Sequence, residues 1–158
     1  MKKYILTIIS LIVVLSLKAQ SNVDEIAFIQ SVYGMDKKDL IAKHMKIDVG
    51  KSELFWQLYD EYEISRKEIG LKRANNIIAY AKKYEKLIAA DADALVKESF
   101  EVQTGFIKLW EKNNIKMSKV LSPVTAAQFI QAEMFLENMV RQELSMDIPL
   151  IGEFELDR

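Results

Sequence analysis

Cysteine is absent from this chain of 158 residues, and histidine occurs only once, as His44. Without cysteine there is no disulfide framework and no thiolate nucleophile. A zinc site of cysteine and histidine is equally excluded, and a di-iron bundle site would need two Glu-x-x-His motifs. The same shortage removes most pairings of a nucleophile with a general base. The sequence therefore predicts a protein that is not an enzyme and holds no cofactor.

Proline and glycine are also scarce, with two and five residues respectively. The interior of the chain is instead dense in Ala, Leu, Lys, Glu, Gln and Met, which favour helices. There is no parallel-sheet pattern, no glycine-rich phosphate loop and no internal repeat. The composition therefore predicts an all-α protein.

No large excess of basic charge is present, because 22 Lys and Arg stand against 23 Asp and Glu. Without the first nineteen residues the balance becomes 19 against 23, a net charge near −4. A general nucleic-acid binder needs a basic excess to displace counterions from phosphates. We therefore expect no nucleic-acid partner.

The first nineteen residues have the organisation of a secretory signal peptide. Lys2 and Lys3 precede an apolar run over residues 5–17, and Ala19 supplies a small residue for cleavage. A permanent transmembrane anchor is the alternative, but it needs roughly twenty apolar residues, more than this run provides. We therefore predict a signal peptide over residues 1–19 and a periplasmic or secreted location for the mature protein.

Most of the remaining chain is expected to be helical. Two short helices are predicted over residues 24–33 and 36–45. A long amphipathic helix follows over residues 52–88, because its apolar residues recur at three-, four- and seven-residue steps. Gly70 and the pair Asn75-Asn76 are weak points where we expect a bend.

Two further helices complete the pattern. One begins at Asp91 or Asp93. Ser122-Pro123 marks the start of the last, over residues 123–144, because serine accepts hydrogen bonds from the first turn and proline has no amide to leave unsatisfied. The tail, residues 147–158, has no helical period and is either a docking strand or loose.

The three longer helices must bury their apolar stripes against one another or against a second subunit. Short turns between them favour antiparallel hairpins. We therefore expect one helical domain over residues 20–146, built from long bent helices as an open bundle or cradle. Both a monomer and a homodimer fit this pattern.

Two segments carry a resemblance to a known family. The segment Leu121 to Phe129 resembles the Leu-Thr/Ser-x-x-Gln helix start of the Spy/CpxP-like periplasmic proteins, with two extra residues before the glutamine. Residues 45–47, followed by 53–62, are similar to the first such signature and the helix after it. The resemblance implies a small helical protein, often a cradle-shaped dimer. It further implies an ATP-independent chaperone or a sensor that tunes envelope-stress and metal-stress responses.

An aromatic cluster and a basic run are the candidate binding residues. The aromatic residues crowd the start of the long helix, where amphipathic rings suit a client or subunit contact, although a wide core face explains them equally well. The basic residues could steer acidic or unfolded chains, but interspersed glutamates also fit an ordinary salt-bridged surface. The proposed client-binding set is Phe55, Trp56, Tyr59, Arg66, Lys67, Arg73 and Lys82.

Three functions remain open after these exclusions. The first is a chaperone that shields apolar segments of unfolded proteins. The second is a sensory or regulatory subunit that docks on a membrane signalling protein, which would be its only link to the membrane. The third is a metal-stress protein that binds copper or zinc, for which methionines such as Met117 and Met139 offer thioether ligands. Their spacing fits core packing better.

Overall fold

A computed structural model describes residues 35–146 and 148–151 of the chain. The predicted signal peptide, the helix expected over 24–33 and the end of the tail lie outside these residues. Within them the elements are helical, without any strand, which confirms the all-α prediction. In chain order they are α2 (Lys37–His44), η1 (Val49–Lys51), α3 (Ser52–Lys83), η2 (Tyr84–Lys86), α4 (Ala89–Val120) and α5 (Pro123–Met146). None of these helices is both long and apolar enough to cross a membrane.

The chain divides into two compact units between Lys46 and Ile47. In the first unit, the described element is α2. Its last turn is closed by the amide of Met45, which donates to the carbonyl of Ile41 at 2.8 Å. The helix predicted over residues 36–45 is therefore confirmed, to within one residue at each end.

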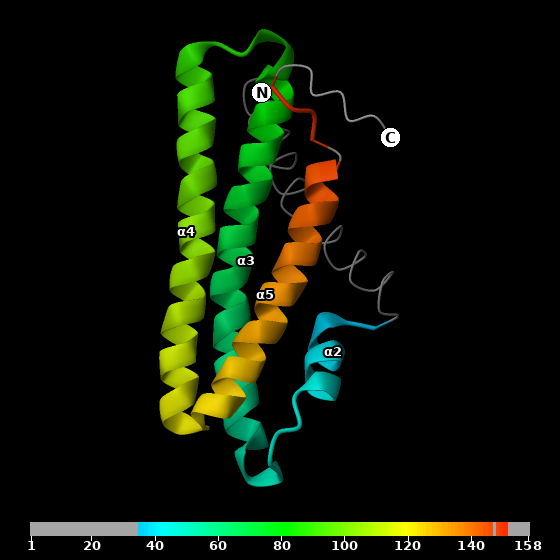
Figure 1. The fold of residues 1–158 in the computed structure, drawn as a ribbon, viewed down its shortest axis with the longest axis vertical. Helices are drawn as coiled ribbons and strands as arrows, with labels where there is room; N and C mark the ends of the chain where they lie inside the picture. The colour runs from blue at the N-terminus through cyan, green and yellow to red at the C-terminus, as the bar shows by residue number, and fades with distance from the viewer. Residues whose placement is uncertain (1–34, 147, 152–158) are drawn as a thin grey trace, which may run out of the picture. The chain divides into compact units, whose positions relative to one another are not determined.

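The second unit contains α3, α4 and α5. Helices α3 and α4 form a long antiparallel hairpin, and α5 starts beside the end of α4 and crosses over α3 (Figure 1). Helix α3 stays helical through Gly70, Asn75 and Asn76. It passes into the 3-10 turn η2 after Lys83, five residues before the predicted end at Ile88.

The start of α5 is fixed by the predicted cap. The amide of Thr125 donates to the hydroxyl oxygen of Ser122 at 3.0 Å, and Pro123 occupies the first helical position. The turn before it is tied to the base of α3, because the ammonium of Lys51 donates to the carbonyl of Leu121 at 2.7 Å. The cap and the hydrogen bond from Lys51 jointly define where α5 leaves the hairpin.

The core of the second unit lies where all three helices meet. Phe129 of α5 is its centre, with ring centroids of Phe55, Tyr59 and Tyr62 at 5.8, 6.1 and 5.1 Å. These edge-to-face contacts add to the burial of apolar area. The other buried apolar residues of the three helices are Leu58, Val102, Phe106, Leu109, Met117, Ala126, Leu136 and Val140.

The core ends partway along the hairpin. No residue in the segment 67–101, all of which is described, is buried. At about 1.5 Å per residue, α3 and α4 are each about 48 Å long, whereas α5 is about 36 Å long. Because α5 is shorter and crosses at an angle, the third helix covers only part of the hairpin (Figure 1). We call residues 67–101 the distal part of the hairpin.

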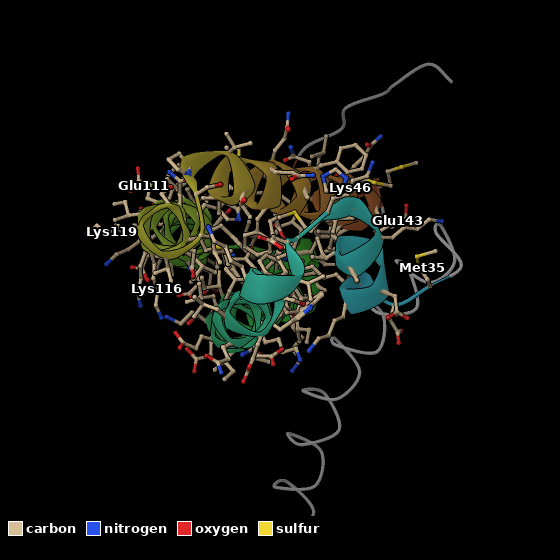
Figure 2. All side chains as sticks on the ribbon, turned by 90° about the horizontal axis from the view of Figure 1, so that it is seen from below. Met35, Lys46, Glu111, Lys116, Lys119 and Glu143 are labelled. Atoms are coloured by element: carbon tan, nitrogen blue, oxygen red, sulfur yellow. The ribbon has the colours of Figure 1, made fainter. Side chains whose placement is uncertain are left out.

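Charged side chains cover the outside of α4. Seen along the helices, Glu111, Lys116 and Lys119 point away from the interior (Figure 2). Lys116 forms an exposed ion pair with Glu61 of α3. The face of α4 opposite the core is therefore an ordinary solvated surface at this end.

Candidate binding groove

A groove of about 750 Å³ opens where α5 separates from α4 over the hairpin. Its lining is mixed, with apolar side chains such as Ile77, Val102 and Ile107 beside amides and charged groups. We call this site the groove. Its lining residues are Arg73, Asn76, Ile77, Ser99, Val102, Gln103, Phe106, Ile107, Trp110, Met134, Glu137, Asn138, Arg141, Gln142, Leu144, Ser145 and Ile148.

An ion pair crosses the groove from α3 to α5. The guanidinium of Arg73 pairs with the carboxylate of Glu137, and both side chains are largely covered, with 14% and 7% of their surface exposed. Arg73 also lies over the ring of Phe106, 5.3 Å from its centroid. A desolvated pair of this kind is costly to break at one end, because the other charge is left without its partner. The pair therefore fixes α5 relative to α3.

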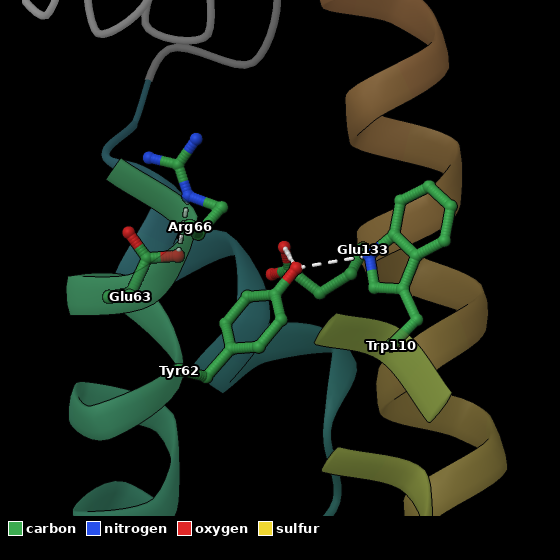
Figure 3. A network of polar contacts seen from close by, with 5 residues as sticks. All are labelled: Tyr62, Glu63, Arg66, Trp110 and Glu133. Carbon is green, nitrogen blue, oxygen red and sulfur yellow. Dashed lines mark hydrogen bonds and ion pairs between the residues drawn. The ribbon is translucent and has the colours of Figure 1, made fainter. Parts of the chain in front are cut away.

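A second polar group joins Tyr62 of α3, Trp110 of α4 and Glu133 of α5 (Figure 3). The hydroxyl of Tyr62 donates to Oε2 of Glu133 at 2.8 Å, and the indole of Trp110 donates to the Tyr62 oxygen at 3.2 Å. Burial raises the pKa of Tyr62 well above its ordinary value, and the nearby Glu133 carboxylate raises it further. The Tyr62 hydroxyl therefore remains a donor throughout the physiological range.

The same end of α3 carries a local ion pair. The guanidinium of Arg66 donates to the carboxylate of Glu63 at 2.9 Å, one helical turn away (Figure 3). Burial raises the pKa of the neighbouring Tyr59, and the Glu63 carboxylate adds to this effect. Arg66 and Glu63 therefore neutralise each other's charge, and Tyr59 lies close to both.

A second opening of about 530 Å³ continues the groove along the distal part of the hairpin. The two share Asn76, Ile77, Ser99 and Ile148. We call this second opening the distal pocket. Its lining is mainly apolar and consists of Asn76, Ile77, Tyr80, Leu87, Ala92, Leu95, Val96, Ser99 and the segment 148–151.

The segment Ile148–Ile151, which we call the strap, lies against this pocket. The hydroxyl of Tyr80 donates to the carbonyl of Pro149 at 2.7 Å, and that of Tyr84 donates to the carbonyl of Leu150 at 3.2 Å. The described part of the predicted tail is therefore docked through its backbone.

Exposed apolar side chains border the groove on both sides. On α4, Val96, Phe100 and Ile107 expose 48%, 63% and 51% of their surface, and they lie on one side of the helix. On α5, Met134 and Phe135 expose 43% and 58%. Of these, Ile107 and Met134 line the groove and Val96 lines the distal pocket, so apolar side chains in both openings are incompletely covered.

The predicted aromatic residues are placed mostly in the core. Phe55 and Tyr59 are buried, with 0% and 3% exposed, so they are covered by the protein itself and are not a client surface in this structure. Trp56 is half-buried and packs edge-on against both, with centroids 5.0 and 5.3 Å away. The alternative reading of this cluster, a wide core face, accounts for its placement.

The predicted basic residues are dispersed. Arg66 is buried beside Glu63, and Arg73 is paired with Glu137 in the groove. Lys67 and Lys82 are exposed on α3. The structure therefore brings only Arg73 of the predicted set into the groove.

Several groove residues were not among the predicted ones. Ile107 could have been found, because it is apolar but lies off the core stripe of its helix. Glu137 in the groove and the buried Glu133 gave no such signal, since a lone glutamate in a helix is ordinarily a surface residue. Tyr80 and Tyr84 were also missed as contacts of the tail.

The metal hypothesis was also compared with the structure. Among residues 35–146 and 148–151, no group of three or more His, Asp or Glu is placed to hold a metal ion. Met117 is fully buried, which agrees with its interpretation as a core residue.

Comparisons of the chain with protein-family models, with curated proteins and with solved structures find no match.

Proposed function

We propose that this protein is exported and binds apolar segments of other proteins in the groove, without catalysing a reaction. The observation that carries the proposal is the groove itself, an open volume of about 750 Å³ beside α5 whose lining includes incompletely covered apolar side chains such as Ile77, Ile107 and Met134. An apolar surface that a protein leaves uncovered is typical of an interaction site.

The chemistry of the groove suits polypeptide better than a small polar ligand. Apolar and polar side chains share the lining, and Gln103, Asn138 and Gln142 can bond to a peptide backbone. Met134 and Leu144 have flexible side chains that adapt to different partners. The resemblance to Spy/CpxP-like proteins and the predicted signal peptide point to unfolded proteins outside the cytoplasm as the clients.

Light scattering of an aggregating client tests the proposal. The protein at a several-fold molar excess should suppress aggregation of a reduced or heat-unfolded client. The Ile107→Asp variant should lose most of this effect, because it places a charge in the apolar lining. Ile64→Asp is the matched control, since Ile64 is also an exposed isoleucine, at 63% against 51% for Ile107, and lies on α3 outside the groove. Absence of suppression by the unaltered protein would refute the chaperone proposal.

Export is tested separately by mass spectrometry of the protein from the envelope fraction. Cleavage after Ala19 would leave an N-terminus at Gln20. Recovery of the intact leader from the cytosol would contradict this part of the proposal.

A second candidate is a regulatory subunit with one dedicated partner. It is favoured by the Arg73 and Glu137 pair, because fixed charges inside an apolar groove discriminate between ligands. If the protein is such a subunit, its purification from envelope extracts should bring down one envelope protein at a fixed stoichiometry. The Ile107→Asp variant should no longer bring that protein down. Many weakly bound proteins would instead support the chaperone.

A further inference from the structure

Two hydrogen bonds hold the backbone of the strap to the hairpin. Tyr80 and Tyr84 are four residues apart, so their hydroxyls lie on the same side of the chain, and their rings stand 5.5 Å apart. They donate to two consecutive carbonyls, those of Pro149 and Leu150. Every residue has a carbonyl, so these two hydrogen bonds can form with any sequence, whereas the apolar lining of the distal pocket favours apolar side chains in the bound segment.

The sequence of the strap favours the extended form that such a site requires. Pro149 has a fixed φ and no amide, and it disfavours a helical conformation at Ile148. The carbonyls of an extended segment have no partners of their own and point outward to external donors. Aromatic grooves that bind proline-containing extended peptides use the same arrangement.

The strap is also only weakly bound to the hairpin. Leu150 and Ile151 line the distal pocket but still expose 57% and 64% of their surface, so their apolar contacts are only partly made. Both hydrogen bonds are exposed, where water competes for the same donors. The distal pocket beside the strap still encloses about 530 Å³.

We propose that the distal pocket with Tyr80 and Tyr84 is a binding site for extended, proline-containing apolar peptide segments, and that the strap is its displaceable internal occupant. This inference rests on the proposed function and specifies the class of ligand that the site takes. The strap lowers the apparent affinity for an external segment in proportion to the time it occupies the site.

Binding of a labelled peptide tests the inference. The probe is a synthetic peptide with the sequence of residues 148–158, followed by fluorescence anisotropy with the full chain. The double variant Leu150→Asp, Ile151→Asp weakens the strap and should bind the probe about tenfold more tightly than the unaltered protein. A probe with serine in place of its Ile, Leu and Phe residues should not bind.

Variants of the two tyrosines that bind the strap complete the experiment. Tyr80→Phe combined with Tyr84→Phe, introduced into the strap-weakened chain, should reduce probe affinity several-fold by removing both donors. Ile64→Asp in the same background is the control and should leave affinity unchanged. Circular dichroism establishes that each variant is folded, as expected for exposed positions.

Two results would overturn the inference. One is failure of the strap-weakened chain to bind the probe, and the other is equal binding with and without the tyrosine hydroxyls. A dimer that dissociates when the strap is weakened would also overturn it, since the strap would then belong to the site of a second copy. If the protein suppresses aggregation but does not bind the probe, only this inference fails. If it binds the probe but does not suppress aggregation, only the chaperone proposal fails.

Discussion

Tyr62 belongs both to the apolar core and to the hydrogen-bonded group that it forms with Glu133 and Trp110. Its ring packs against Phe129, and its hydroxyl bonds to Glu133 while accepting from Trp110. Removing one partner of a buried hydrogen bond leaves the other desolvated, which costs about 1–3 kcal/mol. We therefore expect Tyr62→Phe to lower the free energy of unfolding by about 1–3 kcal/mol, measured by urea denaturation.

The matched control is Tyr84→Phe, which removes an exposed hydroxyl from the same residue type. Water replaces an exposed bond, so this change should cost less than about 0.5 kcal/mol. Equal losses for the two variants would contradict a structural role for the buried bond.

Burial of Tyr59 and Tyr62 also predicts how stability depends on pH. Both pKa values are raised in the folded protein, so the unfolded chain loses these protons first as the pH rises. The stability that the protonated tyrosines provide is complete below about pH 10. Above that value it should fall by about 1.4 kcal/mol per pH unit for each tyrosine.

Urea denaturation between pH 9 and pH 11.5 measures this slope. Tyr62→Phe removes one of the two groups, so the decline should become shallower in that variant. An unaltered slope would show that Tyr62 does not titrate differently in the folded and unfolded states.

At the scale of the element, Gly70 is a position in α3 where a substitution should stabilise the protein. It lies inside α3, and a β-carbon built there meets no atom within 4 Å. Glycine in a helix interior costs about 0.5–1 kcal/mol relative to alanine. Gly70→Ala should therefore raise the free energy of unfolding by about this amount, measured by thermal and urea denaturation.

Gly105 of α4 provides the comparison. A β-carbon there would lie 3.5 Å from the side chain of Ile69, in ordinary van der Waals contact. Gly105→Ala should gain a similar amount without overpacking. Destabilisation by Gly70→Ala would indicate that the helix needs glycine there, as our predicted bend supposed.

Element boundaries were predictable where side chains mark them. Ser122 and Pro123 specify the start of α5, and its observed bounds agree with the prediction to two residues. The end of α3 was not predictable to the same degree, because residues 84–104 contain no glycine or proline. The turn there depends instead on tertiary links, such as the ion pair of Lys83 with Asp91 at 2.5 Å.

At the scale of the whole molecule, the hairpin has a packed part and an open part. In its distal part, polar links such as Asn76 to the carbonyl of Leu95 take the place of buried apolar contacts. Regions with few buried contacts open at lower free energy than the core. Hydrogen exchange should therefore be faster in residues 89–100 than in residues 102–117 of the same helix.

Mass spectrometry of peptides from the two segments measures this difference. The segments belong to one helix, so the comparison is internally controlled. Uniform exchange along α4 would contradict the division of the hairpin that we describe.

The sequence predicted the class of fold but not the groove. Apolar periodicity predicted the three long helices and many of their core residues, including Phe129 and Met117. It does not encode the angle at which α5 crosses α3, which depends on the contacts of Arg73 with Glu137 and of Tyr62 with Glu133. Because Arg73, Glu133 and Glu137 are charged residues, a search for apolar stripes passes over them.

Trp110 has an additional consequence. Its indole lines the groove and at the same time donates to the buried Tyr62 hydroxyl. A chromophore in this position senses the polarity of the groove and the integrity of the core together. The protein therefore carries its own optical reporter, and Trp56→Phe would isolate its emission for following ligand capture and unfolding without a label.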